Sequence, residues 1–367
     1  MSQYVLGLIA GEPAAVRIED GAITAVTPRT HAELPKNARV EDFGEALVAP
    51  GLVDLHVHGG AGEDFMSADA AGLRRVREHL ARHGVTTFLA TTVSAPWAET
   101  LAAVERLANA GLELHLEGPF LSSRRRGVHR EADLLAPRVE RLEELWQRAQ
   151  GRIRMITMAP ELEGALEFIR AAAARGIVVS LGHSDASAAQ AREGIAAGAR
   201  HVTHCFNAMR PLHHREPGLL GEALNNPALS AEIIADGVHV DPRMVGMFLR
   251  LKGPERAVLV SDAISATGCG DGVYKLGGIE VRVSGGCCTA GGVLAGSVLT
   301  LDRAVRNARE SGGLALDAAV RLASENPARV AGLERKGSLA VGADADISIW
   351  SPGGELLATF AGGSRVN

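Results

Sequence analysis

The sequence has few of the features that mark secreted, membrane-bound or disordered chains. Its four cysteines include no CxxC pair, which favours a reduced, intracellular protein over a disulfide framework. The longest stretch without charge, 283–301, is interrupted by glycines and serines and predicts turns and short strands rather than a membrane helix. The first basic residue is Arg17, so the start of the chain lacks the pattern of a secretion signal. We therefore expect a cytoplasmic protein that does not bind a membrane.

Charge is balanced and unclustered. Lysine and arginine number 38 against 43 acidic residues, a formal net charge of −5, and no long run has one sign. A nucleic-acid partner is therefore not expected, and an anionic ligand would need a local cationic pocket. With 46% hydrophobic and 22% charged residues, the composition is that of a globular protein. A length of 367 residues accommodates one large α/β barrel with a small appendage.

Both ends of the chain have β character. The runs 15–19 and 22–26 flank Asp20-Gly21, a strong signal for a two-residue hairpin, and 345–350 alternates between polar and apolar residues. Neither short segment can bury a face alone. We therefore predict one small β-sandwich domain, 1–50 plus 336–367, built from both termini around an inserted domain, 51–335.

The middle of the chain alternates between two kinds of segment. Apolar, β-branched runs recur at 51–57, 85–92, 112–116, 153–158, 177–181, 201–203, 231–235 and 257–261. Stretches with helical periodicity lie between most of them, including 70–83, 98–110, 138–150, 165–175, 186–197 and 242–251. Eight buried strands separated by helices predict a (β/α)8 TIM-like barrel, so the fold class is α/β. The glycine-rich region 268–296 is predicted to form a β insertion after the eighth strand.

Polar residues gather where these predicted strands end, which is where such barrels carry their functional groups. In chain order they are His56, His58, Glu117, His183, His204 and Asp262. The i, i+2 spacing of the first two places both imidazoles on one face of a strand. Histidines with a carboxylate suit a borderline cation such as zinc or iron. A further carboxylate beside a metal-activated water can accept its proton and later deliver it to a leaving group.

Each of these residues also admits a plainer interpretation. The two histidines of 56–58 are compatible with a polar pair in the core, Glu117 with a solvated strand end, and Asp262 with a helix N-cap. His183 or His204 alone would more often be structural. No lysine ends a predicted barrel strand, so a pair of metals bridged by a modified lysine is not expected. Glu117 is the better candidate for a shared ligand.

Several segments resemble the N-acetylglucosamine-6-phosphate deacetylase family of the amidohydrolase superfamily, and the resemblance spans nearly the whole chain. The most specific is THCFNAMRPLHHREPGLLG, 203–221. Others are APGLVDLHVHGG (49–60), HLEGPFLS (115–122), LGHSDA (181–186), ADGVHVDP (235–242) and SDAISATG (261–268).

The resemblance implies a role for each site residue. Glu117, His183 and His204 would hold the principal metal, and His56 and His58 a second one. The implied cofactor is one or two divalent metals per subunit, zinc first, with iron, manganese or cobalt as alternatives. The residues that would bind the sugar phosphate are Asn207, the backbone of Ala208, Arg215 and His239. His129 would polarise the acetyl carbonyl, although the residues after it depart from the HNP-like continuation common in the family. Asp262 would be the general base and acid.

The implied activity is hydrolysis of the acetamide of N-acetyl-D-glucosamine 6-phosphate, in amino-sugar catabolism or cell-wall recycling, by a homodimer. The nearest alternative is another amidohydrolase acting on an N-acyl amino acid or a cyclic amide. A catalytically silent scaffold is a second alternative, but it would be expected to have lost metal ligands or Asp262. A sugar-phosphate binding protein that releases no acetate is a third.

Overall fold

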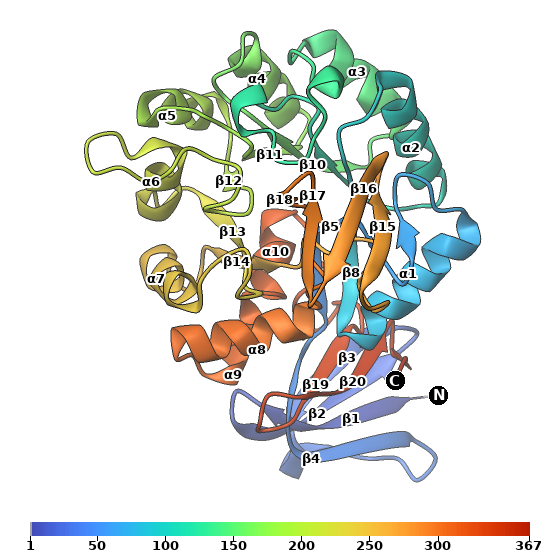
Figure 1. The fold of residues 1–367 in the computed structure, drawn as a ribbon. Helices are drawn as coiled ribbons and strands as arrows, with labels where there is room; N and C mark the ends of the chain where they lie inside the picture. The colour runs from blue at the N-terminus through green and yellow to red at the C-terminus, as the bar shows by residue number, and fades with distance from the viewer. Residues whose placement is uncertain (1) are drawn as a thin grey trace.

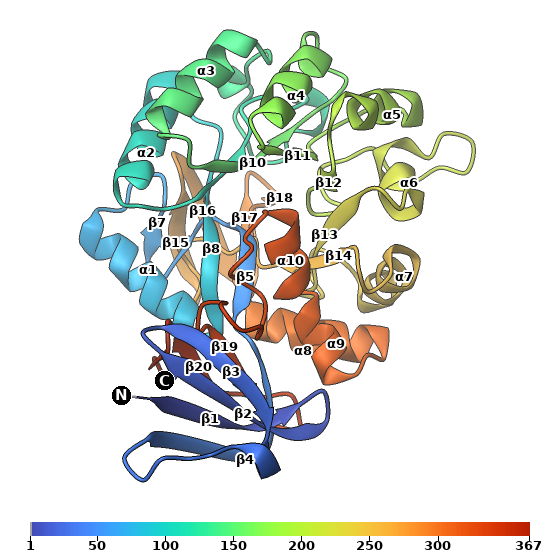
Figure 2. The same ribbon diagram turned by 180° about the vertical axis from the view of Figure 1, so that it is seen from behind.

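A computed structural model describes residues 2–367 and contains the predicted barrel (Figures 1 and 2). Eight strands form one sheet in the order β14-β13-β12-β11-β10-β9-β8-β5, and every paired neighbour in it is parallel. The strands are β5 (Leu52–Val57), β8 (Val85–Thr92), β9 (Leu114–Glu117), β10 (Ile153–Met158), β11 (Val178–Leu181), β12 (His201–Val202), β13 (Ser230–Ile234) and β14 (Ala257–Val260). The (β/α)8 prediction is therefore confirmed.

Helices surround the barrel, as the prediction required (Figure 1). They are α1 (Ala70–Arg82), α2 (Trp97–Asn109), α3 (Val139–Arg148), α4 (Ala165–Ala174), α5 (Ala188–Ala197), α6 (Gly218–Asn225), α7 (Pro242–Lys252), α8 (Leu301–Gly312), α9 (Leu316–Arg321) and α10 (Glu325–Val330). Helix α5 begins later than predicted because Ser187 and Gln190 form a capping box that fixes its start. Within residues 2–367, no helix has the length and hydrophobicity needed to span a bilayer.

The two ends of the chain pair into a seven-stranded sheet in the order β21-β20-β19-β4-β1-β2-β3. Its strands are β1 (Gln3–Ile9), β2 (Glu12–Glu19), β3 (Ala22–Pro28), β4 (Arg39–Pro50), β19 (Ile347–Trp350), β20 (Leu356–Ala361) and β21 (Ser364–Arg365). Asp20 and Gly21 turn the predicted hairpin with φ of 49° and 75°, as a type I′ turn requires. The sheet has a hydrophobic core of its own, around Val16, Ile349 and Phe360. The boundaries 1–50, 336–367 and 51–335 stay a prediction.

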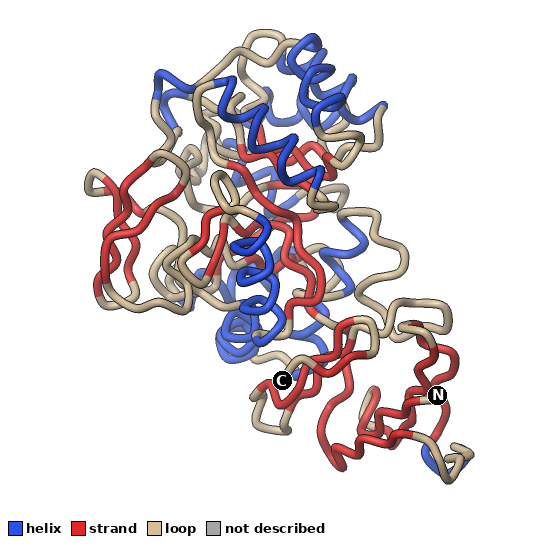
Figure 3. Tube along the Cα trace, turned by 90° about the vertical axis from the view of Figure 1, so that its right-hand side faces the viewer, coloured by secondary structure: helices blue, strands red, loops and turns tan. Residues whose placement is uncertain are grey.

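A separate four-stranded antiparallel sheet stands over the barrel opening, where the β insertion was predicted. It consists of β15 (Gly272–Leu276), β16 (Ile279–Ser284), β17 (Cys287–Ala290) and β18 (Val293–Leu294). Figure 3 shows it from the side, projecting from the barrel. Two short strands, β6 (Gly59–Gly60) and β7 (Glu63–Asp64), follow β5.

The barrel closes between its first and last strands, β5 and β14, through contacts beyond the end of β14. Asp262 N–H donates to the carbonyl of His56 at 2.9 Å, and His58 N–H donates to Ala263 O at 2.8 Å. These two hydrogen bonds bring the residues of the first and last strands to one edge of the barrel opening.

Candidate active site

A cavity of about 320 Å³ opens at the carboxyl ends of the barrel strands. It is lined by nearly all of the predicted site residues: His58, Glu117, His129, His183, His204, Asn207, Ala208, His239 and Asp262. Leu276, Val293 and Leu294 of the four-stranded sheet form part of its wall. His56 is fully buried against this cluster. Arg215 is exposed and does not line the cavity.

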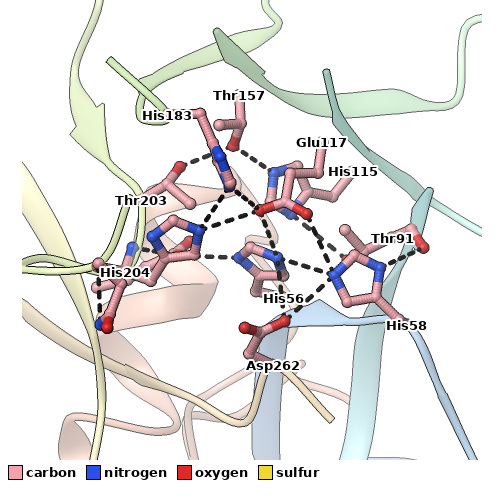
Figure 4. Close-up of polar contacts among 12 residues, drawn as sticks. His56, His58, Thr91, His115, Glu117, Thr157, His183, Thr203, His204 and Asp262 are labelled. Atoms are coloured by element: carbon pink, nitrogen blue, oxygen red, sulfur yellow. Dashed lines mark hydrogen bonds and ion pairs between the residues drawn. The ribbon is translucent and has the colours of Figure 1, made fainter. Parts of the chain in front are cut away.

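Three of these side chains form a compact ligand set (Figure 4). Glu117 Oε1 lies 3.1 Å from both His183 Nε2 and His204 Nε2. The two imidazole nitrogens are 3.2 Å apart. All three side chains are buried.

A second set lies beside the first and consists of His56, His58 and Asp262. His58 Nε2 is 3.2 Å from Asp262 Oδ1 and 3.2 Å from His56 Nε2. Glu117 lies between the two sets, with Oε1 3.3 Å from His56 Nε2 and Oε2 3.4 Å from His58 Nε2. The arrangement agrees with Glu117 as the ligand that two cations would share.

Three of the histidines use Nδ1 for a hydrogen bond outside the cluster, and this leaves Nε2 available to bind a cation. His183 Nδ1 is 3.0 Å from Arg125 O, His58 Nδ1 is 3.2 Å from Thr91 O, and His56 Nδ1 is 3.2 Å from Glu232 Oε2. These oxygens accept, so each Nδ1 carries a proton and each Nε2 can offer a lone pair to the cluster. Tetrahedral ligand atoms at about 2.0–2.2 Å from zinc lie roughly 3.4 Å apart, close to the separations seen here.

The carboxylates of the cluster favour protons on His56 and His58, whose pKa values are raised. Burial lowers the pKa of His58, but hydrogen bonds and charge from Asp262 and Glu117 raise it to about 9. Burial raises the pKa of Glu117, yet His56, His129 and His183 hold it well below its usual range. For Asp262, burial is likewise outweighed by His56 and His58, and the pKa is lowered. A bound cation would replace these protons, so binding is expected to release them.

Backbone conformation aims several of these side chains into the cavity. His183, His204 and Asp262 follow barrel strands with φ of 46°, 23° and 49°, and Ala208 has φ of 48°. Such left-handed conformations are uncommon for residues other than glycine and concentrate at functional sites. At these residues the backbone turns away from the strand direction at the barrel opening.

His129 points a donor at the cavity. Ser94 N–H donates to His129 Nδ1 at 3.3 Å, so the ring proton of the neutral imidazole lies on Nε2. That nitrogen is 3.4 Å from Glu117 Oε2, and the side chain is buried. The predicted role of His129 in polarising a carbonyl is compatible with this orientation.

Three of the four residues predicted to bind the sugar phosphate line the cavity, and the fourth does not. Asn207, Ala208 and His239 line the cavity. His239 Nδ1 lies 2.7 Å from Asp236 Oδ2; burial lowers the pKa of His239, but this carboxylate raises it above its ordinary value. Arg215 instead contacts His214, with Nη1 3.0 Å from its Nε2. Its role in phosphate binding stays a prediction.

The sequence analysis did not identify Glu232, Asp236 and Asp54. Each of these carboxylates contacts a predicted site residue: His56 in the case of Glu232 and Asp54, and His239 in the case of Asp236. Glu232 is fully buried in β13; burial raises its pKa, yet hydrogen bonds from His201 and His56 hold it well below its usual range. The one signal in the sequence was a glutamate within the otherwise uncharged run Ser230–Ile234, because a charge in a buried strand needs a partner.

The comparisons with known proteins show the family to which the chain is related. Residues 47–366 match the amidohydrolase family model. N-acetylglucosamine-6-phosphate deacetylase of Bacillus subtilis is 36% identical over 363 residues, covering 95% of this chain and 91% of that protein. N-acetylgalactosamine-6-phosphate deacetylase of Escherichia coli O157:H7 is 39% identical, covering 87% of this chain and 85% of that protein.

Solved structures also match over the whole chain. A mutant of N-acetyl-D-glucosamine-6-phosphate deacetylase from Mycobacterium smegmatis, in complex with N-acetyl-D-glucosamine-6-phosphate, superposes with a TM-score of 0.93 at 36% identity. The match covers 100% of this chain and 99% of that one. With its barrel, its buried ligand sets and these relatives, the chain belongs to the amidohydrolase family.

Proposed function

We propose that this protein hydrolyses the acetamide of N-acetyl-D-glucosamine 6-phosphate, giving D-glucosamine 6-phosphate and acetate. The observation that carries the proposal is the pair of buried ligand sets around Glu117, open to a cavity that Asp262 and His129 also line. The names of relatives that align over nearly the whole chain support the substrate class.

Glu117, His183 and His204 would hold the principal divalent cation, and His56, His58 and Asp262 a second one. Imidazole and carboxylate ligands favour zinc, with iron, manganese and cobalt as alternatives. A cation bound there acts as a Lewis acid towards the amide carbonyl and lowers the pKa of a water molecule.

The protein's own groups move the protons. The Asp262 carboxylate accepts a proton as the water oxygen bonds to the acetyl carbon. It then delivers that proton to the sugar nitrogen as the C–N bond breaks. His129 donates its Nε2 proton in a hydrogen bond to the carbonyl oxygen, where negative charge develops.

Asn207, the Ala208 backbone and His239 would bind the sugar phosphate, and the raised pKa of His239 favours an anion there. Arg215, exposed on its loop, would supply a planar fork for the phosphate. The proposal includes a cytoplasmic homodimer, in which side chains from a neighbouring subunit would complete the phosphate end of the site.

The test is amine release by zinc-reloaded enzyme from N-acetylglucosamine 6-phosphate, with the unphosphorylated sugar alongside. Fast release from the phosphorylated sugar alone is expected, because the phosphate contacts orient the amide. N-acetylgalactosamine 6-phosphate forms a third arm, since one relative is named for it. Release from none of these, with zinc confirmed bound, would contradict the proposal and favour an N-acyl amino acid or cyclic amide as substrate.

A further inference from the structure

Glu232 lies beneath the cavity without lining it. It stands on β13, and its carboxylate reaches the neighbouring strand β12 and also β5, the first strand of the barrel. Glu232 Oε2 is 3.2 Å from His56 Nδ1, and Oε1 is 3.1 Å from His201 Nε2. The backbone N–H of His204 donates to Oε2 at 3.3 Å. No substrate in the cavity could touch this side chain directly.

The first contact determines which nitrogen of His56 is free. An ionised carboxylate only accepts hydrogen bonds, so the proton of a neutral His56 lies on Nδ1, towards Glu232. The lone pair of Nε2 then faces Glu117, His58 and Asp262. Carboxylates that accept from the far nitrogen of a ligand imidazole orient the ring and raise its basicity.

The contacts to the next strand concern the other ligand set. His204 has φ of 23°, a conformation that its neighbours must maintain. Glu232 holds both sides of this turn, because Cys205 N–H donates to the Glu232 backbone carbonyl at 2.9 Å. The same turn aims His204 Nε2 at Glu117 Oε1 and His183 Nε2.

We propose that Glu232 is a positioning residue for both ligand sets, fixing the ring of His56 and the backbone of His204 so that both offer Nε2 to a divalent cation. This inference rests on the metal ligands of the proposed function. The competing interpretation is that Glu232 only satisfies His201 inside the barrel, in which case its loss would affect stability and leave cation binding unchanged.

Glu232→Gln separates these interpretations because it keeps the side-chain volume and removes the charge. The metal-depleted variant is titrated with Co²⁺, whose visible absorption bands report coordination geometry. We expect Co²⁺ affinity to fall about 10–100-fold relative to the wild type, with altered bands. Asp346→Asn is the matched control: this buried carboxylate, directly before β19, pairs with Lys336 and does not line the cavity. It should lose stability and bind Co²⁺ as the wild type does.

Glu232→Asp keeps the charge, and binding should be stronger in this variant than in Glu232→Gln. If neither variant folds, the wild type loaded with zinc and labelled with ¹⁵N-histidine still tests the inference. A slowly exchanging Nδ1 proton on His56, assigned by its loss in His56→Asn, is expected. A rapidly exchanging proton, or a ring bound through Nδ1, would overturn it.

The two proposals fail in different ways. A wild type that deacetylates the sugar phosphate and binds Co²⁺, beside a Glu232→Gln variant with equal affinity and unchanged bands, would refute the positioning role alone. A wild type that neither binds Co²⁺ nor deacetylates would refute the proposed function, and the role of Glu232 with it.

Discussion

Among single residues, Asp262 has the most specific chemical role in the proposed reaction. Asp262→Asn removes the proton acceptor while keeping its size, so we predict that kcat falls about 10²–10⁴-fold with little change in KM. Steady-state rates with N-acetylglucosamine 6-phosphate check this prediction. Metal content measured on the same sample separates a lost base from a lost ligand. Asp271→Asn, an exposed residue near the four-stranded sheet, is the control, and a wild-type rate in Asp262→Asn would contradict the assignment.

His239 predicts a pH dependence of substrate binding. Asp236 raises its pKa against the effect of burial, so its positive charge is fully present below about pH 6.5 and is lost as pH rises through the raised value. KM for the sugar phosphate should therefore increase across that range. His239→Gln should show a higher KM without this increase. Titration of the substrate phosphate affects both proteins equally, so parallel KM profiles would show that His239 does not contact it.

The ligand residues were predictable one by one because each ends a strand of recognisable pattern. Glu232 was not, because its partners His56 and His201 stand on other strands, and only the closed barrel brings them together. The orientation of Arg215 was equally inaccessible from its motif, since a loop's direction depends on packing that local sequence does not encode.

At the scale of elements, most strands and helices agree with the sequence prediction to within one or two residues. The third strand was predicted from residue 112 but pairs only from Leu114 to Glu117. Strand β12 comprises only His201–Val202, one residue shorter than the predicted 201–203. Thr203 leaves the ladder just before the backbone of His204 turns left-handed. Alternation and helical periodicity report burial, whereas strand ends depend on such local turns.

The contact between the first and last strands predicts a stability effect. Asp54 on β5 accepts from Ser261 Oγ at 2.5 Å, Ser261 N at 3.3 Å and His56 N at 3.2 Å. Asp54→Ala leaves these buried donors unpaired, so we predict a loss of about 2–4 kcal/mol in the free energy of unfolding. Urea denaturation measures this loss. Asp42→Ala is the control, because Asp42 is exposed and pairs with Arg29 at the surface. This variant should lose no more than about 1 kcal/mol of the free energy of unfolding. Equal losses in the two variants would exclude a special role for Asp54.

At the scale of the whole molecule, the terminal sheet and the barrel share buried contacts. Trp350 of β19 is fully buried within the barrel's hydrophobic core. The pairing of the chain ends was predictable because two short β segments must share a sheet. The four-stranded sheet was predictable as a β insertion, but its position over the cavity required the closed barrel.

The central claim is that this barrel binds a divalent cation at Glu117, His183 and His204 and uses it to deacetylate an amino-sugar phosphate. The most direct test is to remove metal with a chelator, return Zn²⁺ in steps, and measure amine release from N-acetylglucosamine 6-phosphate at each step. We predict no turnover in the metal-free protein, and a rate that rises with Zn²⁺ and saturates at one or two equivalents per chain. Full turnover by protein confirmed to be free of metal would contradict the account.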